Sequence, residues 1–211
     1  MLAIFKREFK SYFQNVIGWL FVAALLAVYG LYFYVYNLKN GYPYISYNLK
    51  GIGFIMMIAV PILTMRSLSD EKKTKTDQLM LTSPVSVGRI VAGKYFAMAA
   101  VYTIDIALFA LSPLVLSIYG KVALSEAYVA LFGYWLYGLS CIAVGLFISS
   151  ISESVIISAI LTFAALFLSY MMQSITGLIS SSGNLLTKVL NCFDLYTPFE
   201  NFVSGCFSVT S

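Results

Sequence analysis

Asp105 is the residue whose type and position most directly suggest chemistry in this chain. It lies in the segment VYTIDIALFALSP and is the only carboxylate well inside a strongly apolar stretch. A charged side chain at the centre of a membrane helix costs roughly 2.5 to 3.5 kcal/mol on insertion scales, so such a group usually has a role. Three interpretations stay open. Asp105 is a neutral or hydrogen-bonded structural group with Tyr102 or Thr103 as partner, it lines a substrate path, or it relays protons.

Other reactive side chains are scarce. The chain has no histidine, and Cys141, Cys192 and Cys206 form no CxxC pair, so we expect no metal site. A Cys192–Cys206 disulfide remains an open alternative. We find neither paired intramembrane carboxylates nor a motif-borne serine for acid–base chemistry, and no GxxxxGK[ST] loop for ATP phosphates. The chain is therefore expected to be no enzyme and to hold no cofactor of its own.

The elements that would position Asp105 are membrane-spanning helices. Apolar residues make up 60% of the chain and charged residues 10%, whereas globular proteins carry roughly 25% charged residues. A helix needs roughly 20 apolar residues to cross the hydrocarbon core of a bilayer. Five stretches approach or exceed this length, and they cover residues 16–36, 51–66, 92–118, 124–149 and 154–176. The sequence predicts an all-α integral membrane protein with a single transmembrane domain over residues 1–211.

Details within these stretches predict how the helices are built. Lys50 and Arg66 bound the second stretch closely, so either their side chains snorkel or residues 44–50 extend the helix. Pro61 and Pro113 each remove a backbone donor inside a span and favour a kink. Small residues recur every four positions along spans four and five, which favours close packing: Cys141, Gly145 and Ser149, then Ser154, Ser158 and Thr162.

The distribution of basic residues predicts the orientation. Nine of them flank one side of the predicted spans: Lys6, Arg7, Lys10, Arg66, Lys72, Lys73, Lys75, Arg89 and Lys94. The other side holds Lys39, Lys50, Lys121 and Lys188. The positive-inside rule therefore predicts a cytoplasmic N-terminus and an external segment 177–211. We favour a chain that stops before a sixth span over a true five-span protein, and the net charge of +4 requires no nucleic-acid partner.

Residues 1–15 have the pattern of an amphipathic helix lying on the bilayer. Aromatic and apolar residues fall at helical spacing: Phe5, Phe9, Tyr12, Phe13 and Val16. Basic residues occupy other positions around the helix, where they suit anionic lipid headgroups. We expect an interfacial elbow helix that leads into span one at residue 16.

Residues 67–91 form the loop most suited to a soluble partner. Thr74 and Asp77 have the spacing of a capping box, and the run TDQLMLT that follows ends at Pro84. This short helix would expose apolar side chains outside the membrane, namely Leu79, Met80 and Leu81. Such a helix suits docking into a groove of a partner protein, although a solvated loop that only joins two spans is the alternative.

These residues resemble a known family, the permease subunits of type 2 ABC exporters, particularly the gliding-motility and copper-processing branch. Like this chain, such permeases begin with a basic amphipathic elbow helix. After their second span they show the stretch E-x-x-x-G-T-[DE]-x-L-L-x-x-P-[VL]-[ST], and a lysine begins span three. The matching residues here are Glu71, Thr76, Asp77, Leu79, Pro84, Val85, Ser86, Gly93, Lys94 and Tyr95. Lys75 replaces the usual glycine, and Met80 replaces a common leucine.

The resemblance implies that residues 70–83 form a cytoplasmic coupling helix seated in a cleft of a separate ATP-binding subunit. The contact residues would be Glu71, Thr76, Asp77, Leu79, Met80, Leu81 and Pro84, with a smaller contact near Glu153. ATP and Mg would belong to that subunit, and a second permease copy would complete the path in the cell inner membrane. The alternative function is a proton- or ion-coupled secondary transporter that uses Asp105.

Overall fold

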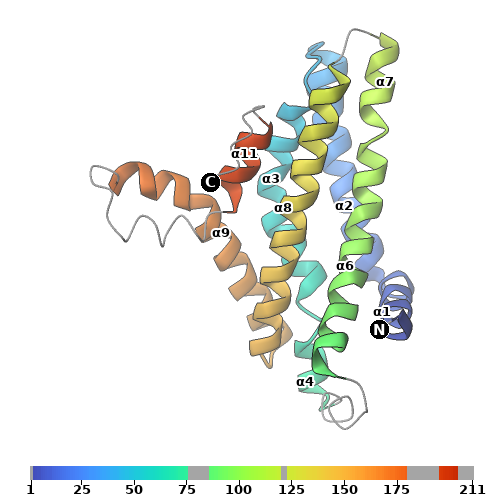
Figure 1. The fold of residues 1–211 in the computed structure, drawn as a ribbon, viewed down its shortest axis with the longest axis vertical. Coiled ribbons are helices and arrows are strands. Elements are labelled where there is room, and N and C mark those ends of the chain that lie inside the picture. Colours follow the sequence, from blue (N-terminus) through green and yellow to red (C-terminus); the bar gives the residue numbers. More distant parts are fainter. Residues whose placement is uncertain (1, 76–85, 120–122, 180–194, 204–211) are drawn as a thin grey trace.

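A computed structural model describes residues 2–75, 86–119, 123–179 and 195–203 (Figure 1). The described residues form helices and connecting turns, with no strand among them. The elements in chain order are α1 (Leu2–Gln14), α2 (Val16–Tyr32), the π-helix η1 (Phe33–Lys39), α3 (Ser46–Thr64), α4 (Ser69–Lys73), α6 (Val87–Phe109), α7 (Ser112–Tyr119), α8 (Leu124–Ile151), α9 (Val155–Ile179) and α11 (Tyr196–Val203). The predicted all-α fold class is confirmed.

Five helical segments of the described chain are long and apolar enough to cross a membrane. By length and composition they are Val16–Lys39, Ser46–Lys73, Val87–Ile118, Leu124–Ile151 and Val155–Met172. Four of these segments contain the whole of a stretch predicted from hydropathy, and the fifth contains most of the stretch predicted at residues 154–176. The helices α2, α3, α6 and α8 run side by side as an upright bundle, while α1 and α4 lie at one end of it (Figure 1). We refer to this end of the bundle as the α4 end.

The second span is lengthened by residues before its apolar run, which was one of the two predicted alternatives. Helix α3 begins at Ser46, within the 44–50 segment expected to lengthen the span. Lys50 consequently lies near the end opposite α4, where its ammonium is 3.4 Å from the Glu200 carboxylate of α11. Both side chains are about one-third exposed, at 32% each. The lysine therefore keeps contact with a polar environment at the end of a helix that is otherwise apolar.

The third span is broken rather than kinked at its proline. It begins at Val87, five residues before the predicted start at residue 92, and α6 ends at Phe109. A new helix, α7, starts at Ser112 and has Pro113 in its first turn. Proline is well tolerated at that position because the first N–H groups of a helix have no intrahelical acceptor. The irregularity therefore lies where the sequence predicted it, but it is a boundary between two helices and not a kink within one helix.

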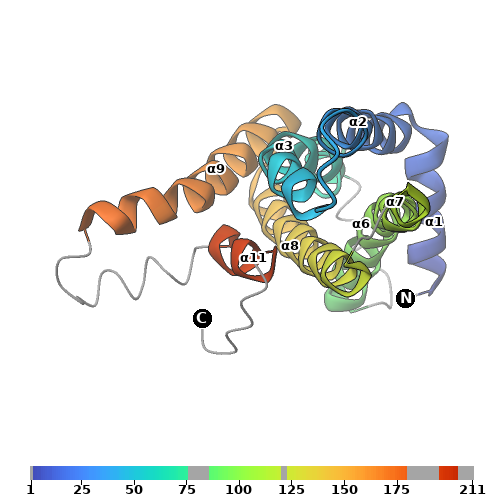
Figure 2. The same ribbon diagram turned by 90° about the horizontal axis from the view of Figure 1, so that it is seen from above.

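The N-terminal helix α1 lies crosswise to the upright spans, as the view from above shows (Figure 2). Its aromatic rings form a continuous row, because Phe5 stacks on Phe9, Phe9 contacts Phe13, and Phe13 meets Trp19 of α2 edge to face. These rings repeat at the four-residue spacing that places side chains on one face of a helix. The row anchors α1 against the start of span one.

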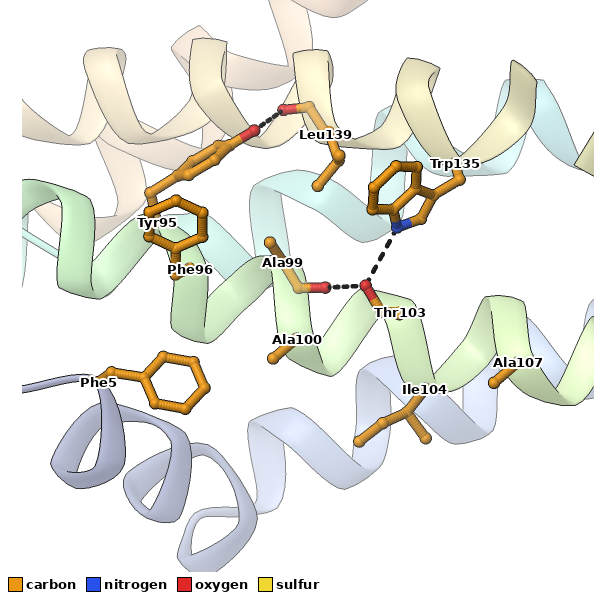
Figure 3. Close-up of a pocket in the computed structure, with 10 residues that line it drawn as sticks. All are labelled: Phe5, Tyr95, Phe96, Ala99, Ala100, Thr103, Ile104, Ala107, Trp135 and Leu139. Carbon is orange, nitrogen blue, oxygen red and sulfur yellow. Dashed lines mark hydrogen bonds between the residues drawn. The ribbon is translucent and has the colours of Figure 1, made fainter. Parts of the chain in front are cut away.

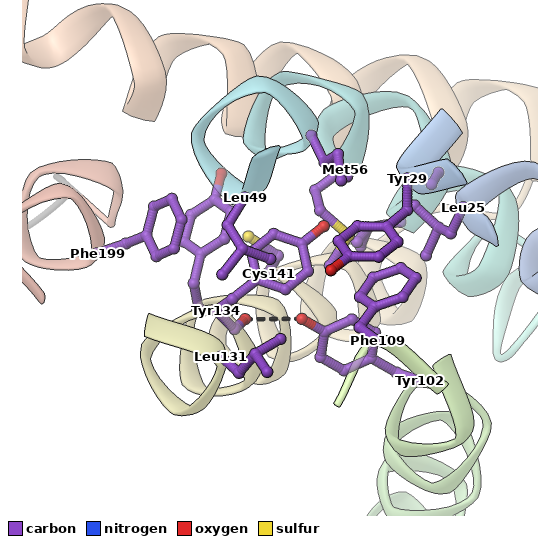
Figure 4. Close-up of a cluster of buried hydrophobic side chains, with 14 of the residues drawn as sticks. Leu25, Tyr29, Leu49, Met56, Tyr102, Phe109, Leu131, Tyr134, Cys141 and Phe199 are labelled. Carbon is purple, nitrogen blue, oxygen red and sulfur yellow. Dashed lines mark hydrogen bonds between the residues drawn. The ribbon is translucent and has the colours of Figure 1, made fainter. Parts of the chain in front are cut away.

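The core of the bundle combines aliphatic side chains with several buried tyrosines and phenylalanines (Figure 4). Tyr102 and Tyr134 are fully buried, and the Tyr102 hydroxyl donates a 2.7 Å hydrogen bond to the Tyr134 carbonyl oxygen. The Tyr102 ring fits there because residue 138 is glycine. A Cβ atom at Gly138 would lie 2.3 Å from the Tyr102 Cζ atom, a distance shorter than any real contact. Close approach of α6 to α8 therefore depends on Gly138.

The predicted seam of small residues on span four packs against α3. Cys141 and Ser149 are fully buried, and a Cβ atom at Gly145 would lie 2.5 Å from the Thr64 hydroxyl oxygen of α3. On span five, Ser158 and Thr162 are also fully buried. Small side chains at these positions let the helix backbones come close together, as is common between membrane helices.

Beyond span five, α11 folds back onto the bundle. Helix α9 continues to Ile179, three residues past the predicted end of the span at residue 176, and extends away from the other helices (Figures 1 and 2). Tyr196, Phe199 and Val203 of α11 are buried against the core. Part of the segment predicted to be external is thus packed on the bundle. Cys192 and Cys206, the candidate disulfide pair, lie outside the described residues.

Candidate functional site

A buried lysine joins three separate segments at the α4 end of the bundle. Lys94, in the second turn of α6, is only 2% exposed. Its ammonium lies 2.7 Å from the Glu71 carboxylate of α4 and 3.4 Å from the Glu8 carboxylate of α1. It also donates a 2.9 Å hydrogen bond to the Ser67 carbonyl oxygen, just before α4. One side chain therefore connects the N-terminal helix, the short helix α4 and the third span.

The charges of this cluster are balanced. A buried ammonium is costly unless opposite charges and acceptors surround it, and Lys94 has two carboxylates and one carbonyl oxygen. Arg7 supplies the second positive charge, with its guanidinium 2.6 Å from Glu8 and 3.9 Å from Glu71. Arg7 is 58% exposed, so its contribution to stability is small compared with that of Lys94. We refer to Arg7, Glu8, Glu71 and Lys94 as the charged cluster.

The opposite side of α4 is held by the end of span four. The Ser149 hydroxyl oxygen of α8 accepts hydrogen bonds from the backbone N–H groups of Leu68 and Ser69, at 3.1 and 3.2 Å. The first N–H groups of a helix lack intrahelical partners, so Ser149 satisfies donors that would otherwise be unpaired. Lys72 of α4 donates to the Ser150 carbonyl oxygen. Helix α4 is consequently fixed on one side to α1 and α6 and on the other side to α8.

Tyr12 closes the contact between the elbow helix and span two. Its hydroxyl donates a 3.4 Å hydrogen bond to the Leu63 carbonyl oxygen near the end of α3. Burial, with a smaller effect of the nearby Glu8 charge, raises the pKa of the Tyr12 phenol above its ordinary value. The phenol therefore remains a neutral hydrogen-bond donor at physiological pH. Beside it, a cavity of about 450 Å³ is lined by residues of both α1 and α4.

The structure describes only part of the predicted coupling helix. Glu71 lies in α4, which begins at Ser69 and ends at Lys73. Thr74 follows the end of α4, where the Thr74 hydroxyl donates to the Asp70 carbonyl oxygen at 2.8 Å. The remaining predicted contact residues lie outside the described residues: Thr76, Asp77, Leu79, Met80, Leu81 and Pro84. The capping box and the apolar docking surface therefore stay predictions.

Asp105 lies in the centre of the bundle, far along α6 from the charged cluster. The residue is fully buried, and neither carboxylate oxygen has a hydrogen-bond partner within the described part of the chain. The two partners suggested by the sequence bond elsewhere. Tyr102 donates to the Tyr134 carbonyl oxygen, and Thr103 donates to the Ala99 carbonyl oxygen at 2.7 Å. The structure therefore does not join Asp105 to either of them.

Sequence reasoning named Glu71 and Lys94 but missed Glu8 and Ser149. Glu8 is the only acidic residue among the basic residues of α1. That isolation was an available signal, because a half-buried carboxylate needs a cationic partner. Ser149 was assigned to close helix packing, which it provides, but its hydroxyl also holds α4. Glu153, predicted as a second contact, is exposed in the turn between α8 and α9.

The fold defines a multi-pass helical membrane protein whose charged cluster lies at one end of its spans. The family model described as ABC-2 family transporter protein matches residues 30–207. Because this match covers most of the chain, the protein belongs to the ABC-2 transporter family. It is therefore a membrane transport component, and its family domain is not a catalytic one. A comparison with curated proteins found no match.

Proposed function

We propose that this chain is the permease subunit of an ATP-driven exporter and that α4 transmits movement from a separate ATP-binding subunit to the spans. ATP and Mg would be bound by that subunit. The observation that carries the proposal is the attachment of α4 on both sides, through Lys94 to α1 and α6 and through Ser149 to α8. A contact at residues 70–83 would then act on three elements of the bundle together.

The mechanism follows from the strength of these attachments. Lys94 is buried, so its attraction to Glu71 is screened less by water than a surface ion pair would be. A displacement of α4 would either break the Lys94 ion pairs, which costs free energy, or move α1 and α6 together with α4. Moving the helices together is the less costly response, because each bond is retained. Closure of the ATP-binding subunits would in this way tilt the spans and open the path to the opposite side.

The proposed orientation places the α4 end in the cytoplasm of a cell inner membrane. Residues 6–10, 66–75 and 89–94 carry the nine basic residues counted from the sequence, and the structure places these segments at the same end (Figure 1). The positive-inside rule assigns that end to the cytoplasm. A second permease copy would complete the translocation path, and the motif around Glu71 favours the gliding-motility and copper-processing branch.

Co-purification with the ATP-binding subunit from the same operon tests the proposal. We expect a stable complex whose ATPase rate responds to the permease. Leu79→Asp with Leu81→Asp should abolish the complex, whereas Glu71→Gln should keep assembly and weaken the ATPase response severalfold. Asp70→Asn is the matched control, because Asp70 lies next to Glu71 but makes only a half-exposed 4.0 Å contact with Arg66. Assembly that persists in the double Asp variant contradicts the coupling assignment.

A second candidate function, a proton- or ion-coupled transporter, is favoured by one observation. Asp105 is a fully buried carboxyl group without a hydrogen-bond partner among the described residues. Membrane carboxyl groups of this kind serve proton relays in pumps and transporters. Transport by the purified chain in proteoliposomes under a proton gradient, abolished by Asp105→Asn, would support this function. Export that requires the ATP-binding subunit and tolerates Asp105→Asn would exclude it.

A further inference from the structure

An apolar groove runs along the outer face of the third span and begins at the α4 end. It has a volume of about 540 Å³ and lies between α1, α6 and α8 (Figure 3). Ten residues line it: Phe5, Tyr95, Phe96, Ala99, Ala100, Thr103, Ile104, Ala107, Trp135 and Leu139. Alanines form much of its floor, while aromatic rings form its walls. From the structure we propose that this groove binds one acyl chain of an anionic phospholipid.

The dimensions of the groove suit one leaflet of a bilayer. Along α6 it extends from Tyr95 to Ala107, a distance of about 18 Å at about 1.5 Å per residue. The hydrocarbon layer of a single leaflet is about 15 Å thick. Phe5 of α1, at the α4 end, closes the groove at the depth expected for an interfacial helix. An acyl chain would therefore enter beside α1 and follow α6 toward the middle of the membrane.

The polar atoms in the groove wall are already satisfied. The Trp135 indole donates a 3.1 Å hydrogen bond to the Thr103 hydroxyl oxygen, and that hydroxyl donates to the Ala99 carbonyl oxygen (Figure 3). The Tyr95 hydroxyl donates a 3.3 Å hydrogen bond to the Leu139 carbonyl oxygen. Because the donors of Trp135, Thr103 and Tyr95 are all engaged within the protein, this wall presents mainly apolar atoms and suits a hydrocarbon chain.

Charge at the mouth of the groove points to an anionic headgroup. Arg89 precedes the groove on α6. It shares one helical face with positions 96, 100, 103 and 107, since the successive spacings are seven, four, three and four residues. Arg89 is exposed and makes no ion pair with the described residues. Lys6, next to Phe5 in α1, is also exposed and unpaired in the described chain. These two cations suit a lipid phosphate at the level of α1.

Headgroup charge must supply the selectivity of such a site. Lipid tails are as apolar as the groove wall, so moving a chain from the bilayer into the groove gains little from the hydrophobic effect. Each basic residue near the surface favours anionic lipid by about fivefold in affinity. The site would therefore prefer phosphatidylglycerol to phosphatidylcholine, and loss of Lys6 or Arg89 would reduce that preference without changing binding of the neutral lipid.

The two tryptophans of the chain allow a direct test. In the full-length Trp19→Phe chain, Trp135 is the single tryptophan and lies in the groove wall. This protein, in detergent, is titrated with phosphatidylglycerol or phosphatidylcholine brominated on the acyl chain, and fluorescence quenching is recorded. We expect saturable quenching at about one phosphatidylglycerol per chain. The Trp135→Phe chain is the reference, because its Trp19 is 60% exposed outside the groove and should be quenched without saturation.

Substitutions separate the groove from the general lipid layer. Lys6→Gln and Arg89→Gln should each weaken phosphatidylglycerol quenching of Trp135 by about fivefold, as argued for a surface basic residue. Ala100→Leu should fill the groove and remove the saturable component. Ala24→Leu is the matched control, since Ala24 is exposed on α2 outside the groove. Lys6→Gln and Arg89→Gln change only exposed side chains, so they keep the test informative if Ala100→Leu disturbs folding.

Two results would overturn the proposal. Equal, non-saturating quenching of Trp135 and Trp19 by both lipids would mean that the groove holds only exchanging bulk lipid. A dimer by light scattering, with Trp135 protected from every brominated lipid until the dimer dissociates, would mean that a second copy of the chain covers the groove.

Discussion

The Lys94 ammonium lies 2.7 Å from the Glu71 carboxylate, although 23 residues separate them in the chain. Glu71 belongs to a short helix outside the bundle, while Lys94 is buried in the second turn of the third span. Glu8 of the N-terminal helix completes the contact at 3.4 Å. This arrangement makes the stability of the α4 end depend on a lysine that is only 2% exposed.

Replacing the buried lysine should destabilise the protein strongly. Lys94→Met leaves Glu8 and Glu71 without their buried partner, and we expect a loss of about 2 kcal/mol. This is less than the loss for a wholly buried pair, because both carboxylates keep some contact with water. The measurement is the thermal unfolding midpoint in detergent. Adding Glu71→Gln to Lys94→Met should restore part of the loss, whereas strictly additive effects would argue against an energetic connection.

Ser149 is expected to matter more than other serines of the same helix. Ser149→Ala leaves the N–H groups of Leu68 and Ser69 without an acceptor and should cost about 1 to 3 kcal/mol. Amide hydrogen exchange at residues 68 and 69 should accelerate. Ser140→Ala is the control, because the Ser140 hydroxyl bonds only its own helix, at the Leu136 carbonyl oxygen. Similar exchange in both variants would contradict the proposed attachment of α4.

Gly138 should tolerate no larger residue. In Gly138→Ala the new methyl group would collide with the Tyr102 ring, which is fully buried and has little room to move. Overpacking of this kind costs about 1 to 3 kcal/mol. The unfolding midpoint of Gly30→Ala provides the comparison, because no atom lies within 4 Å of a Cβ atom placed at Gly30. That variant should be neutral or slightly stabilised, since alanine favours the helix by roughly 0.5 to 1 kcal/mol.

The buried Asp105 side chain is expected to lower the free energy of unfolding of the protein. Its carboxylate oxygens have no hydrogen-bond partner among the described residues, so Asp105→Leu removes a desolvated polar group and is expected to raise the unfolding midpoint. Asp105→Asn should change stability little, because it keeps a polar group in the same place. If transport falls in the more stable Asp105→Leu protein, the carboxyl group serves function rather than folding. A lower midpoint would instead indicate a structural partner.

Docking of α11 should depend on its aromatic face. Phe199 is 2% exposed and stacks on Tyr137 of α8 at a ring distance of 5.1 Å. Phe199→Ala should cost about 3 to 5 kcal/mol, as for other buried aromatic residues, and should expose α11 to proteases. Lys50→Gln should cost less than about 1 kcal/mol, because the Lys50–Glu200 pair is partly exposed. Protease sensitivity that rises in Lys50→Gln but not in Phe199→Ala would mean that charge rather than ring packing holds α11.

The sequence by itself determined the approximate position of the five spans found among the described residues. Hydrophobic length is a local property, so the run before Lys39 and the run after Val155 each predict a membrane helix without reference to any other segment. Proline chemistry is also local, and it located the irregularity at Pro113. Whether that irregularity is a kink or a helix boundary depends on how the neighbouring helices pack, and the sequence did not decide it.

Only the tertiary structure decided which residues meet. Glu8, Glu71 and Lys94 come from three segments, and no spacing along the chain predicts that the Lys94 ammonium lies within 4 Å of both carboxylates. The same is true of Ser149 and the backbone before α4, and of Asp105, whose expected partners turned out to bond elsewhere. The physical reason is that hydropathy specifies which helices form, whereas close packing at residues such as Gly138 and Gly145 specifies which faces come into contact.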